Sequence, residues 1–207
     1  MTLFLGKTAI SPVINVGGGS VTPSAKYKLL QRVIDDSNNE IGTVSGFFTD
    51  KNDVEYAVVC LDAIYRKSSA QWASATENVT NMPLYSNLTI WDAPETATEN
   101  TTLILASTTS SACTHCRSKS FTIGGVTYYG QLPNIIELVD IARHRTAINA
   151  ADTSGGSITI VTNTTYWSSS QFTINNGWCI SANGTVGASG KIYNYSVCPV
   201  LEIPNTL

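Results

Sequence analysis

Apolar and polar positions alternate in short blocks between residues 26 and 61. Apolar residues precede and follow the polar run 35–39, and a second polar run, 49–53, separates Phe47-Phe48 from the nearly unbroken apolar stretch Tyr56–Leu61. Turn-forming residues between two apolar runs predict β-hairpins. We therefore expect two successive hairpins here, with Tyr56–Leu61 as a central strand that is buried on both faces.

The clearest helix is expected after Pro133. Asn134 is a good N-cap, and Glu137 three residues later completes a capping box. Apolar residues then recur on one helical face, which predicts packing against a sheet: Ile135, Leu138, Val139 and Ala142. We expect Arg143–Arg145 at the C-terminal end of this helix, where positive charge complements the helix dipole, with a further turn or two over residues 146–151. A strand, Ile158–Val161, is expected next.

The remaining segments are less regular. Residues 68–111 are polar and interrupted by prolines, so we expect connecting structure there, with Leu103–Leu105 as its strand-like part. Residues 1–25 combine short apolar runs with a Gly17–Ser20 hinge, which predicts an N-terminal docking arm or, alternatively, a disordered or edge-strand terminus. The expected organisation is therefore an arm over 1–25 and one domain over 26–207.

Composition narrows the classes of function. The chain has 207 residues, of which 43% are hydrophobic and only 13% charged, with a formal net charge of −3. The apolar content is sufficient for a folded core, and the charge gives no basis for binding nucleic acid or an anionic membrane. No apolar run has the length of a signal-peptide core or a membrane span. A surface made of Ser, Thr and Asn suits a secreted or virion protein.

The five cysteines do not form a recognisable metal or redox pattern. Cys113 and Cys116 have the spacing of half a zinc site, but the only other histidine besides His115 is His144, and no second pair of ligands has the required spacing. We therefore expect these two cysteines to be core residues on a helix, and we expect no metal and no cofactor.

Residues 166–200 stand apart from the rest of the chain. Ser, Asn, Gly, Thr and Tyr dominate, and Lys191 is the one charged residue. Contact surfaces of antibodies have such a composition, because Tyr gives contact area at little entropic cost and Ser, Gly and Asn give adaptable hydrogen bonds. Any surface β-meander with tight turns also has it, so composition alone leaves both interpretations open.

The order of short sequence motifs in and before this segment gives further information. The segment contains, in order, Tyr166-Trp167-Ser168-Ser169-Ser170, Trp178, Asn183-Gly184-x-Val186, Lys191 and Val197-Cys198-Pro199-Val200, and it follows Leu132-Pro133-x-x-x-Glu137-Leu138. This order resembles the variable proteins of diversity-generating retroelements, which are C-type-lectin-fold proteins of bacteria and their phages. Related lectin-fold domains that are not diversified share the pattern. Two departures stand out: Cys198 occupies a position where the family commonly has Arg, and one residue is missing between Trp178 and Gly184.

The resemblance implies an α+β, C-type-lectin-like fold with a mixed, mostly antiparallel sheet, one or two helices and terminal strands that pair with each other. It also implies a fixed scaffold: Trp167, Ser168, Ser169, Trp178 and Lys191. In the family, variation arises at Asn codons of the AAY type mutated at adenine, which never yield Lys, Gln, Glu, Met or Trp. The expected diversified, ligand-binding positions all pass this test: Phe172, Thr173, Ile174, Asn175, Cys179, Ser181, Thr185, Gly187, Ala188, Ser189, Gly190, Ile192, Tyr193 and Ser196.

Strand alternation refines the expected surface. Trp178, Ile180 and Ala182 would face the core, while Cys179 and Ser181 would face outward. Because Gly187–Gly190 carries almost no side-chain area, we expect the larger side chains to anchor a ligand: Phe172, Ile174, Ile192 and Tyr193. A disulfide between Cys179 and Cys198 is not expected if assembly takes place in a cytoplasm.

The expected function is receptor or ligand binding, of the phage tail-fibre-tip or adhesin type, without enzymatic activity. The partner would be a bacterial surface protein or carbohydrate, with the arm docked on a virion or tail-fibre protein and the chain assembled as a homo-oligomer, a trimer. Location would be the virion, or otherwise the extracellular space or bacterial surface. A structural decoration protein is the main alternative. A remoter one is an oxidase like the formylglycine-generating enzymes, which share the fold and act through a cysteine pair, here Cys179 and Cys198.

Overall fold

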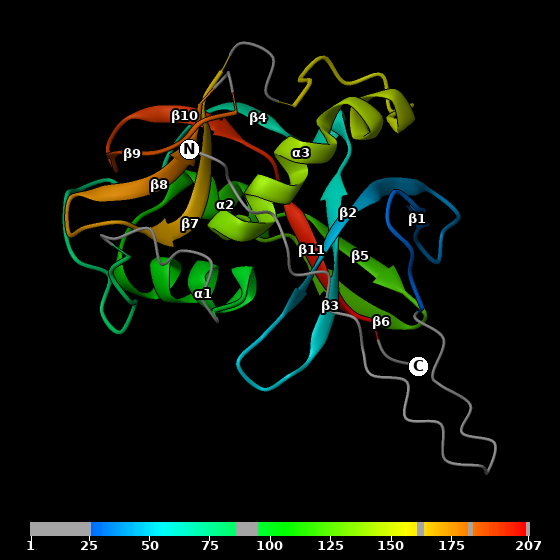
Figure 1. Ribbon diagram of the computed structural model, residues 1–207, viewed down its shortest axis with the longest axis horizontal. Coiled ribbons are helices and arrows are strands. Elements are labelled where there is room, and N and C mark those ends of the chain that lie inside the picture. Colours follow the sequence, from blue (N-terminus) through cyan, green and yellow to red (C-terminus); the bar gives the residue numbers. More distant parts are fainter. Residues whose placement is uncertain (1–25, 86–94, 161–163, 182–183, 206–207) are drawn as a thin grey trace, which may run out of the picture.

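Two β-sheets, a β-hairpin and three α-helices make up the computed structural model (Figure 1), which describes residues 26–85, 95–160, 164–181 and 184–205. This is an α+β architecture with mostly antiparallel strands, as predicted, although with three α-helices rather than one or two. The predicted arm, residues 1–25, lies outside the described residues.

The first sheet confirms both predicted hairpins. It contains the first and the last described strand, but these lie at opposite edges and, contrary to expectation, do not pair with each other, because β2 and β3 lie between them. Its strand order is β1-β2-β3-β11, and every pairing is antiparallel. The side chains of Asp35 and Asp50 accept hydrogen bonds from backbone amides two and four residues ahead, which closes the two turns. The strands are β1 (Arg32–Ile34), β2 (Glu40–Thr49), β3 (Glu55–Leu61) and β11 (Val200–Pro204).

The second sheet carries the segment singled out by its composition. Its order is β4-β10-β7-β8-β9, in which β10 and β7 are parallel and the other neighbours antiparallel. A separate hairpin, β5–β6, lies beside the first sheet (Figure 1). The strands are β4 (Lys67–Gln71), β7 (Tyr166–Gln171), β8 (Asn176–Ile180), β9 (Val186–Gly190), β10 (Asn194–Val197), β5 (Ser120–Ile123) and β6 (Val126–Tyr129); a 3-10 turn, η1 (Ala63–Tyr65), precedes β4.

Three helices cover these sheets. Helix α3 (Ile135–Ala151) begins at the predicted capping box and packs on β2, β7 and β8. Helix α1 (Ala97–Ser107) contacts β7 and β11, and α2 (Ser111–Arg117) contacts β4. Among the described residues, no helix is both long and apolar enough to cross a membrane.

Three local expectations were wrong. Leu103–Leu105 lies in α1, not in a strand, because Thr96 and Glu99 form a second capping box that starts a helix. Arg143–Arg145 lies in the middle of α3, since the helix runs on to Ala151. The described part of the expected strand Ile158–Val161, residues 158–160, forms no strand, and Val161 lies outside the described residues. The backbone groups of Ile158 and Ile160 bond to the side chains of Arg66 and Asn149 instead of to a neighbouring strand.

Three hydrophobic clusters explain why the central strands are buried on both faces. The first packs α3 against β3 and β8, the second packs α1 and α2 against the second sheet, and the third joins the first sheet to the β5–β6 hairpin. In β3, Val58 and Cys60 enter the first cluster while Val59 and Leu61 enter the third, which confirms the prediction for this strand. Cys113 and Cys116 are fully buried on α2, also as predicted.

A pair of carboxyl groups links two helix starts. Glu137 accepts a hydrogen bond from the backbone of Asn134 at the start of α3, and Glu202 accepts bonds from the amides of Ala97 and Thr98 at the start of α1. Burial, and then the neighbouring Glu202, raise the pKa of Glu137 well above its usual range. The last strand is thereby tied to both helices.

Candidate ligand-binding surface

Strand β7 provides the buried floor of the surface. All six of its residues are buried, and its side chains bond inward: Trp167 Nε1 donates to the carbonyl of Ala70 at 3.0 Å, and Ser168 Oγ donates to the carbonyl of Trp178 at 3.0 Å. Trp178 Nε1 in turn donates to the carbonyl of Tyr85 at 3.1 Å. All five residues expected as scaffold, the four on β7 and β8 and Lys191, are buried.

The Lys191 side chain is fully buried beneath the turns of the second sheet. Its ammonium donates to the carbonyls of Glu77 and Ile174, each at 2.7 Å, and to the side-chain oxygen of Gln171. It also lies 4.6 Å from the centre of the Trp72 ring, a cation–π contact. Three oxygen acceptors match the three N–H bonds of an ammonium, so its hydrogen-bonding capacity is fully used.

Burial is also the main influence on the charge of this group. It lowers the pKa of Lys191 to about 8, while the carboxylate of Glu77 acts in the opposite direction. At neutral pH the amine therefore stays mostly protonated and holds its three acceptors.

Lys191 joins two turns of the sheet through its backbone as well. Its amide donates to the carbonyl of Asn175 at 3.1 Å, and its carbonyl accepts from the amide of Ala73 at 3.1 Å. The β7–β8 turn, residues 172–175, and the β9–β10 turn, residues 190–193, consequently lie side by side. The resemblance implied only a scaffold role for this lysine, and the structure shows a physical basis for one.

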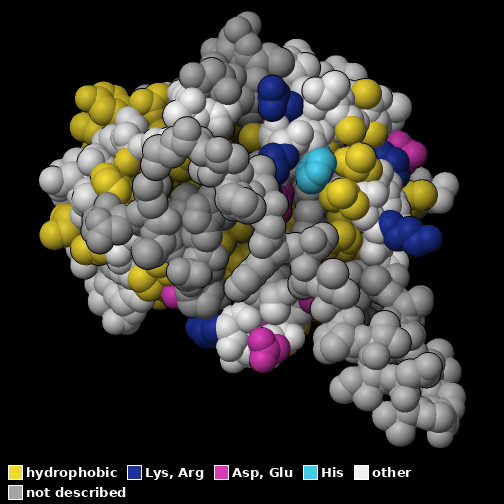
Figure 2. Space-filling model, in the orientation of Figure 1, with side chains coloured by type: hydrophobic (Ala, Val, Ile, Leu, Met, Phe, Trp, Pro, Cys, Tyr) yellow, Lys and Arg dark blue, Asp and Glu magenta, His cyan; other side chains and the backbone are white. Residues whose placement is uncertain are grey.

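Large apolar side chains are exposed on these two turns. Ile174, Ile192 and Tyr193 are 49%, 43% and 57% exposed, and we call these three residues the tip patch. Figure 2 shows hydrophobic side chains gathered along the edge of the molecule where β8, β9 and β10 lie. Exposed apolar side chains held on a rigid support are typical of a contact surface.

Aromatic rings connect the tip patch to the interior. The Tyr193 and Tyr195 ring centres are 6.5 Å apart, and Tyr195 lies 4.7 Å from Trp167. The Tyr195 hydroxyl is 2.8 Å from Ser189 Oγ on β9. Tyr195 and Trp72 were not predicted. Tyr195 was detectable, because residues two apart in an extended segment share a face and Tyr193 was already a candidate.

The structure brings most, but not all, of the predicted ligand-binding positions to the surface. Exposed are Ile174, Asn175, Thr185, Ala188, Ile192 and Tyr193; partly buried are Phe172, Thr173, Ser181, Gly187, Ser189 and Gly190; buried are Cys179 and Ser196. Among the expected anchors, Phe172 packs edge-to-face on Trp178, with ring centres 4.7 Å apart, so part of its area faces inward.

Two of those expectations were wrong. Cys179 does not face outward: it pairs with Trp167 across β7 and β8 and lies in the second hydrophobic cluster, where burial raises its pKa to about 11. Ser196 is buried on β10, and its hydroxyl donates to the carbonyl of Ser68. Both residues lie on interior strands whose neighbours and helices cover them.

The predicted ligand-binding positions in the turns are divided between the two ends of strands β8 and β9. Ser181 and Thr185 flank the β8–β9 turn, whereas residues 172–175 and 190–193 lie at the other end of the same strands. Strand β8 has five residues, so the two ends are about 17 Å apart. Among the residues that the structure describes, only the end that carries the tip patch combines exposed apolar side chains with the Lys191 support. Ala182 lies outside the described residues.

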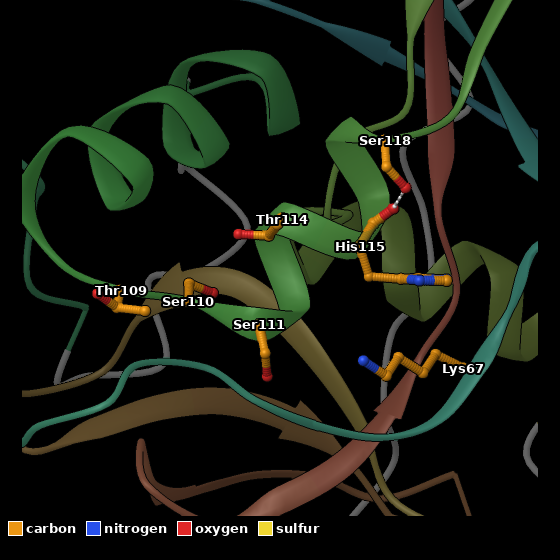
Figure 3. A pocket seen from close by; sticks show the side chains of 7 residues that line it. All are labelled: Lys67, Thr109, Ser110, Ser111, Thr114, His115 and Ser118. Carbon is orange, nitrogen blue, oxygen red and sulfur yellow. Dashed lines mark hydrogen bonds between the residues drawn. The ribbon is translucent and has the colours of Figure 1, made fainter.

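A second candidate is a cavity of about 360 Å³ between β4 and α2. Figure 3 shows Lys67 opposite hydroxyl side chains, among them Ser111 and Thr114. His115 also lines the cavity, but its Nε2 lies 2.7 Å from the carbonyl of Tyr65, and burial lowers its pKa. The cavity contains none of the predicted ligand-binding residues.

No group of three or more His, Cys, Asp or Glu side chains that could hold a metal ion occurs within the described ranges. The five cysteines are buried and free.

Fold and surface together define an α+β domain that presents turns on a supported β-sheet. No protein-family model matches the chain, and no curated protein matches its sequence. Among solved structures, it is similar to a fimbrial protein from Bacteroides ovatus ATCC 8483, with a TM-score of 0.58 and 14% sequence identity. The match covers 80% of this chain and 44% of that protein, so the chain spans less than half of its length. At this identity the likeness concerns the fold alone.

Replacing Lys191 tests its structural role. Lys191→Met keeps an unbranched side chain, one heavy atom shorter, but leaves three buried oxygens without their donor, so the free energy of unfolding should fall by about 2–4 kcal/mol in urea denaturation. Lys28→Met, at an exposed lysine, is the matched control and should change it by about 0.5 kcal/mol or less. Equal effects of the two substitutions would contradict this role.

Two glycines, Gly177 on β8 and Gly187 on β9, test which positions of the second sheet accept a side chain. A Cβ at Gly177 would lie 2.9 Å from the ring of Trp72, whose Nε1 is bonded to the carbonyl of Ser168, so Gly177→Ala should destabilise the fold by about 1–3 kcal/mol. A Cβ at Gly187 would have nothing within 4 Å, and the φ of this residue is not positive, so Gly187→Ala should be neutral or stabilising by about 0.5 kcal/mol. Thermal unfolding of both variants measures this, and a destabilised Gly187→Ala would show that this position does not accept side chains.

Proposed function

We propose that this chain is a ligand-binding domain of the surface-adhesin type, with the C-type-lectin-like fold of the variable proteins of diversity-generating retroelements. The tip patch is its contact surface, and the ligand is a bacterial surface protein or carbohydrate. The observation that carries the proposal is the combination of three exposed apolar side chains with a buried, fully bonded lysine directly beneath them.

Rigid support is what makes such a patch effective in binding. A few aromatic and aliphatic anchors supply most of the affinity in protein interfaces, and preorganised anchors lose little entropy on binding. The tip patch meets both conditions: Tyr193 continues a line of aromatic rings to Trp167, and the Ile174 carbonyl is held by the Lys191 ammonium.

The distribution of buried and exposed residues supports the proposal that this surface is diversified. Gln171, Trp178 and Lys191 cannot arise by adenine mutation of an AAY codon, and all three are buried. Of the fourteen positions expected to vary, only Cys179 and Ser196 are buried, and the tip patch lies entirely among the variable ones. Exposed side chains would thus change while the buried floor stays constant.

We also propose a location and an assembly for the domain. We place the domain on a virion, or otherwise in the extracellular space or on a bacterial surface, joined through residues 1–25 to a larger assembly and repeated in a homo-oligomer, a trimer. The likeness in fold to a fimbrial protein supports a surface role. The low content of charged residues, 13%, suits close packing beside copies of the chain. We propose neither nucleic-acid binding nor membrane insertion.

No observation favours the oxidase alternative. Cys179 lies in the second hydrophobic cluster and Cys198 in the first, so the two cysteines considered for that chemistry do not form a pair. A decoration protein without a ligand is the alternative that the binding experiment separates from our proposal.

Binding should depend on Tyr193 and not on a comparable tyrosine elsewhere. Tyr193→Ala should weaken binding of the labelled protein to intact bacterial cells or to bacterial glycan arrays by at least about 10-fold, as expected for loss of a central aromatic anchor. Tyr129→Ala is the matched control, because Tyr129 is 51% exposed but lies on β6, away from β9 (Figure 1). It should leave binding unchanged.

Treatment of the cells identifies the ligand class. Loss of binding after protease indicates a protein ligand, and loss after periodate oxidation of sugars indicates a carbohydrate. Equal binding by the two tyrosine variants would exclude the tip patch as the contact surface, and absence of binding by the unmodified protein to every cell and array tested would favour the decoration protein.

A further inference from the structure

Two cysteines that are far apart in the sequence meet in the core. Cys60 Sγ on β3 and Cys198 Sγ, two residues before β11, are 3.2 Å apart, although the residues are 138 positions apart in sequence. Both are fully buried in the first hydrophobic cluster. Sulfurs at this distance share a thiol hydrogen bond, and a disulfide requires a further approach of about 1 Å.

The surroundings of the pair distinguish its two members. The hydrogen bond from Cys60, followed by the neighbouring guanidinium of Arg66, lowers the pKa of Cys198 against the effect of burial. The same sulfur–sulfur contact and burial raise the pKa of Cys60. Arg66 is held in place by the carbonyls of Leu61 and Ile158 and by Asp152, 3.2 Å away. In the folded protein, Cys198 is therefore the thiol of the pair whose environment favours the thiolate.

We propose that Cys60 and Cys198 form a disulfide when the chain folds in an oxidising compartment, which covalently joins β3 to the segment leading into the last strand. The disulfide considered from the sequence, Cys179 with Cys198, does not have this geometry, because Cys179 lies in the second cluster and Cys198 in the first.

The reaction requires an external disulfide donor, such as oxidised glutathione or a protein disulfide. The thiolate of one of the two cysteines attacks one donor sulfur, the donor S–S bond breaks, and one donor thiolate leaves. The thiol of the other cysteine then loses its proton, attacks the sulfur of the first cysteine in the mixed disulfide, and releases the second donor thiolate. The two cysteines lose two electrons and two protons in total, and the donor becomes two thiols.

The burial of the pair sets the time of the reaction. Since neither sulfur is exposed in the folded protein, the donor must react before β11 docks beside β3. Once formed, the bond is protected from reductants by the same burial. It would close a loop spanning most of the chain, and such a crosslink stabilises chiefly by restricting the unfolded state. For a surface protein, this fastens the strand on which the closure of the first sheet depends.

Thiol counting after refolding tests the inference. The reduced, denatured chain is refolded in a mixture of oxidised and reduced glutathione, and the folded fraction is denatured in guanidinium with iodoacetamide. Three of the five cysteines should be labelled, and mass spectrometry should find the Cys60 and Cys198 peptides joined. The melting temperature should be higher by roughly 5–15 °C than after refolding in dithiothreitol.

Two cysteine variants test whether the difference in melting temperature comes from a disulfide between Cys60 and Cys198. Cys60→Ala should remove the difference in melting temperature between the two refolding conditions, whereas Cys179→Ala, at another buried cysteine, should keep it. Five labelled cysteines in the folded fraction, or a crosslink between other cysteines, would overturn the inference. The count on the unmodified protein decides this even if Cys60→Ala does not fold.

Discussion

The buried ammonium of Lys191 fixes the arrangement of the proposed binding surface. Its acceptors come from the segment around Glu77, from Gln171 at the end of β7 and from Ile174 in the β7–β8 turn. Because a charge removed from water must stay paired, these segments cannot separate without a large loss of stability. The two turns that carry the tip patch are therefore held next to each other, while the side chains of Ile174, Ile192 and Tyr193 stay exposed.

Features encoded by neighbouring residues were predictable from the sequence. Asn134 and Glu137 lie three residues apart and cap α3 as their spacing indicated, and the aspartate-rich runs 35–39 and 49–53 close both hairpins. Much of the surface was predictable too, because Ile192 and Tyr193 are large apolar residues in a segment that is otherwise polar. One local signal was overlooked: Thr96 and Glu99 have the spacing of a capping box, and this outweighs the strand-like residues that follow.

The expectations that failed at the candidate surface depended on distant parts of the chain. Alternation along β8 assumes one covered face, but α1 and α2 cover the second face of this sheet, so Cys179 is buried. Likewise, nothing near Cys198 indicates that Cys60 lies beside it, because the contact exists only once the last strand has paired with β3. One acceptor of Lys191 and its aromatic partner were hidden for the same reason, since Glu77 and Trp72 precede it by more than a hundred residues.

We propose that exposed positions of this surface vary while the buried positions beneath them stay constant. The nucleotide sequence downstream of the gene tests this proposal most directly. We expect a near-identical repeat of the codons for residues 166–200, beside a reverse transcriptase, that has adenines where the codons for Ile174, Ile192 and Tyr193 differ and is identical at those for Trp178 and Lys191. Absence of such a repeat, or differences concentrated at the buried positions, would contradict the account.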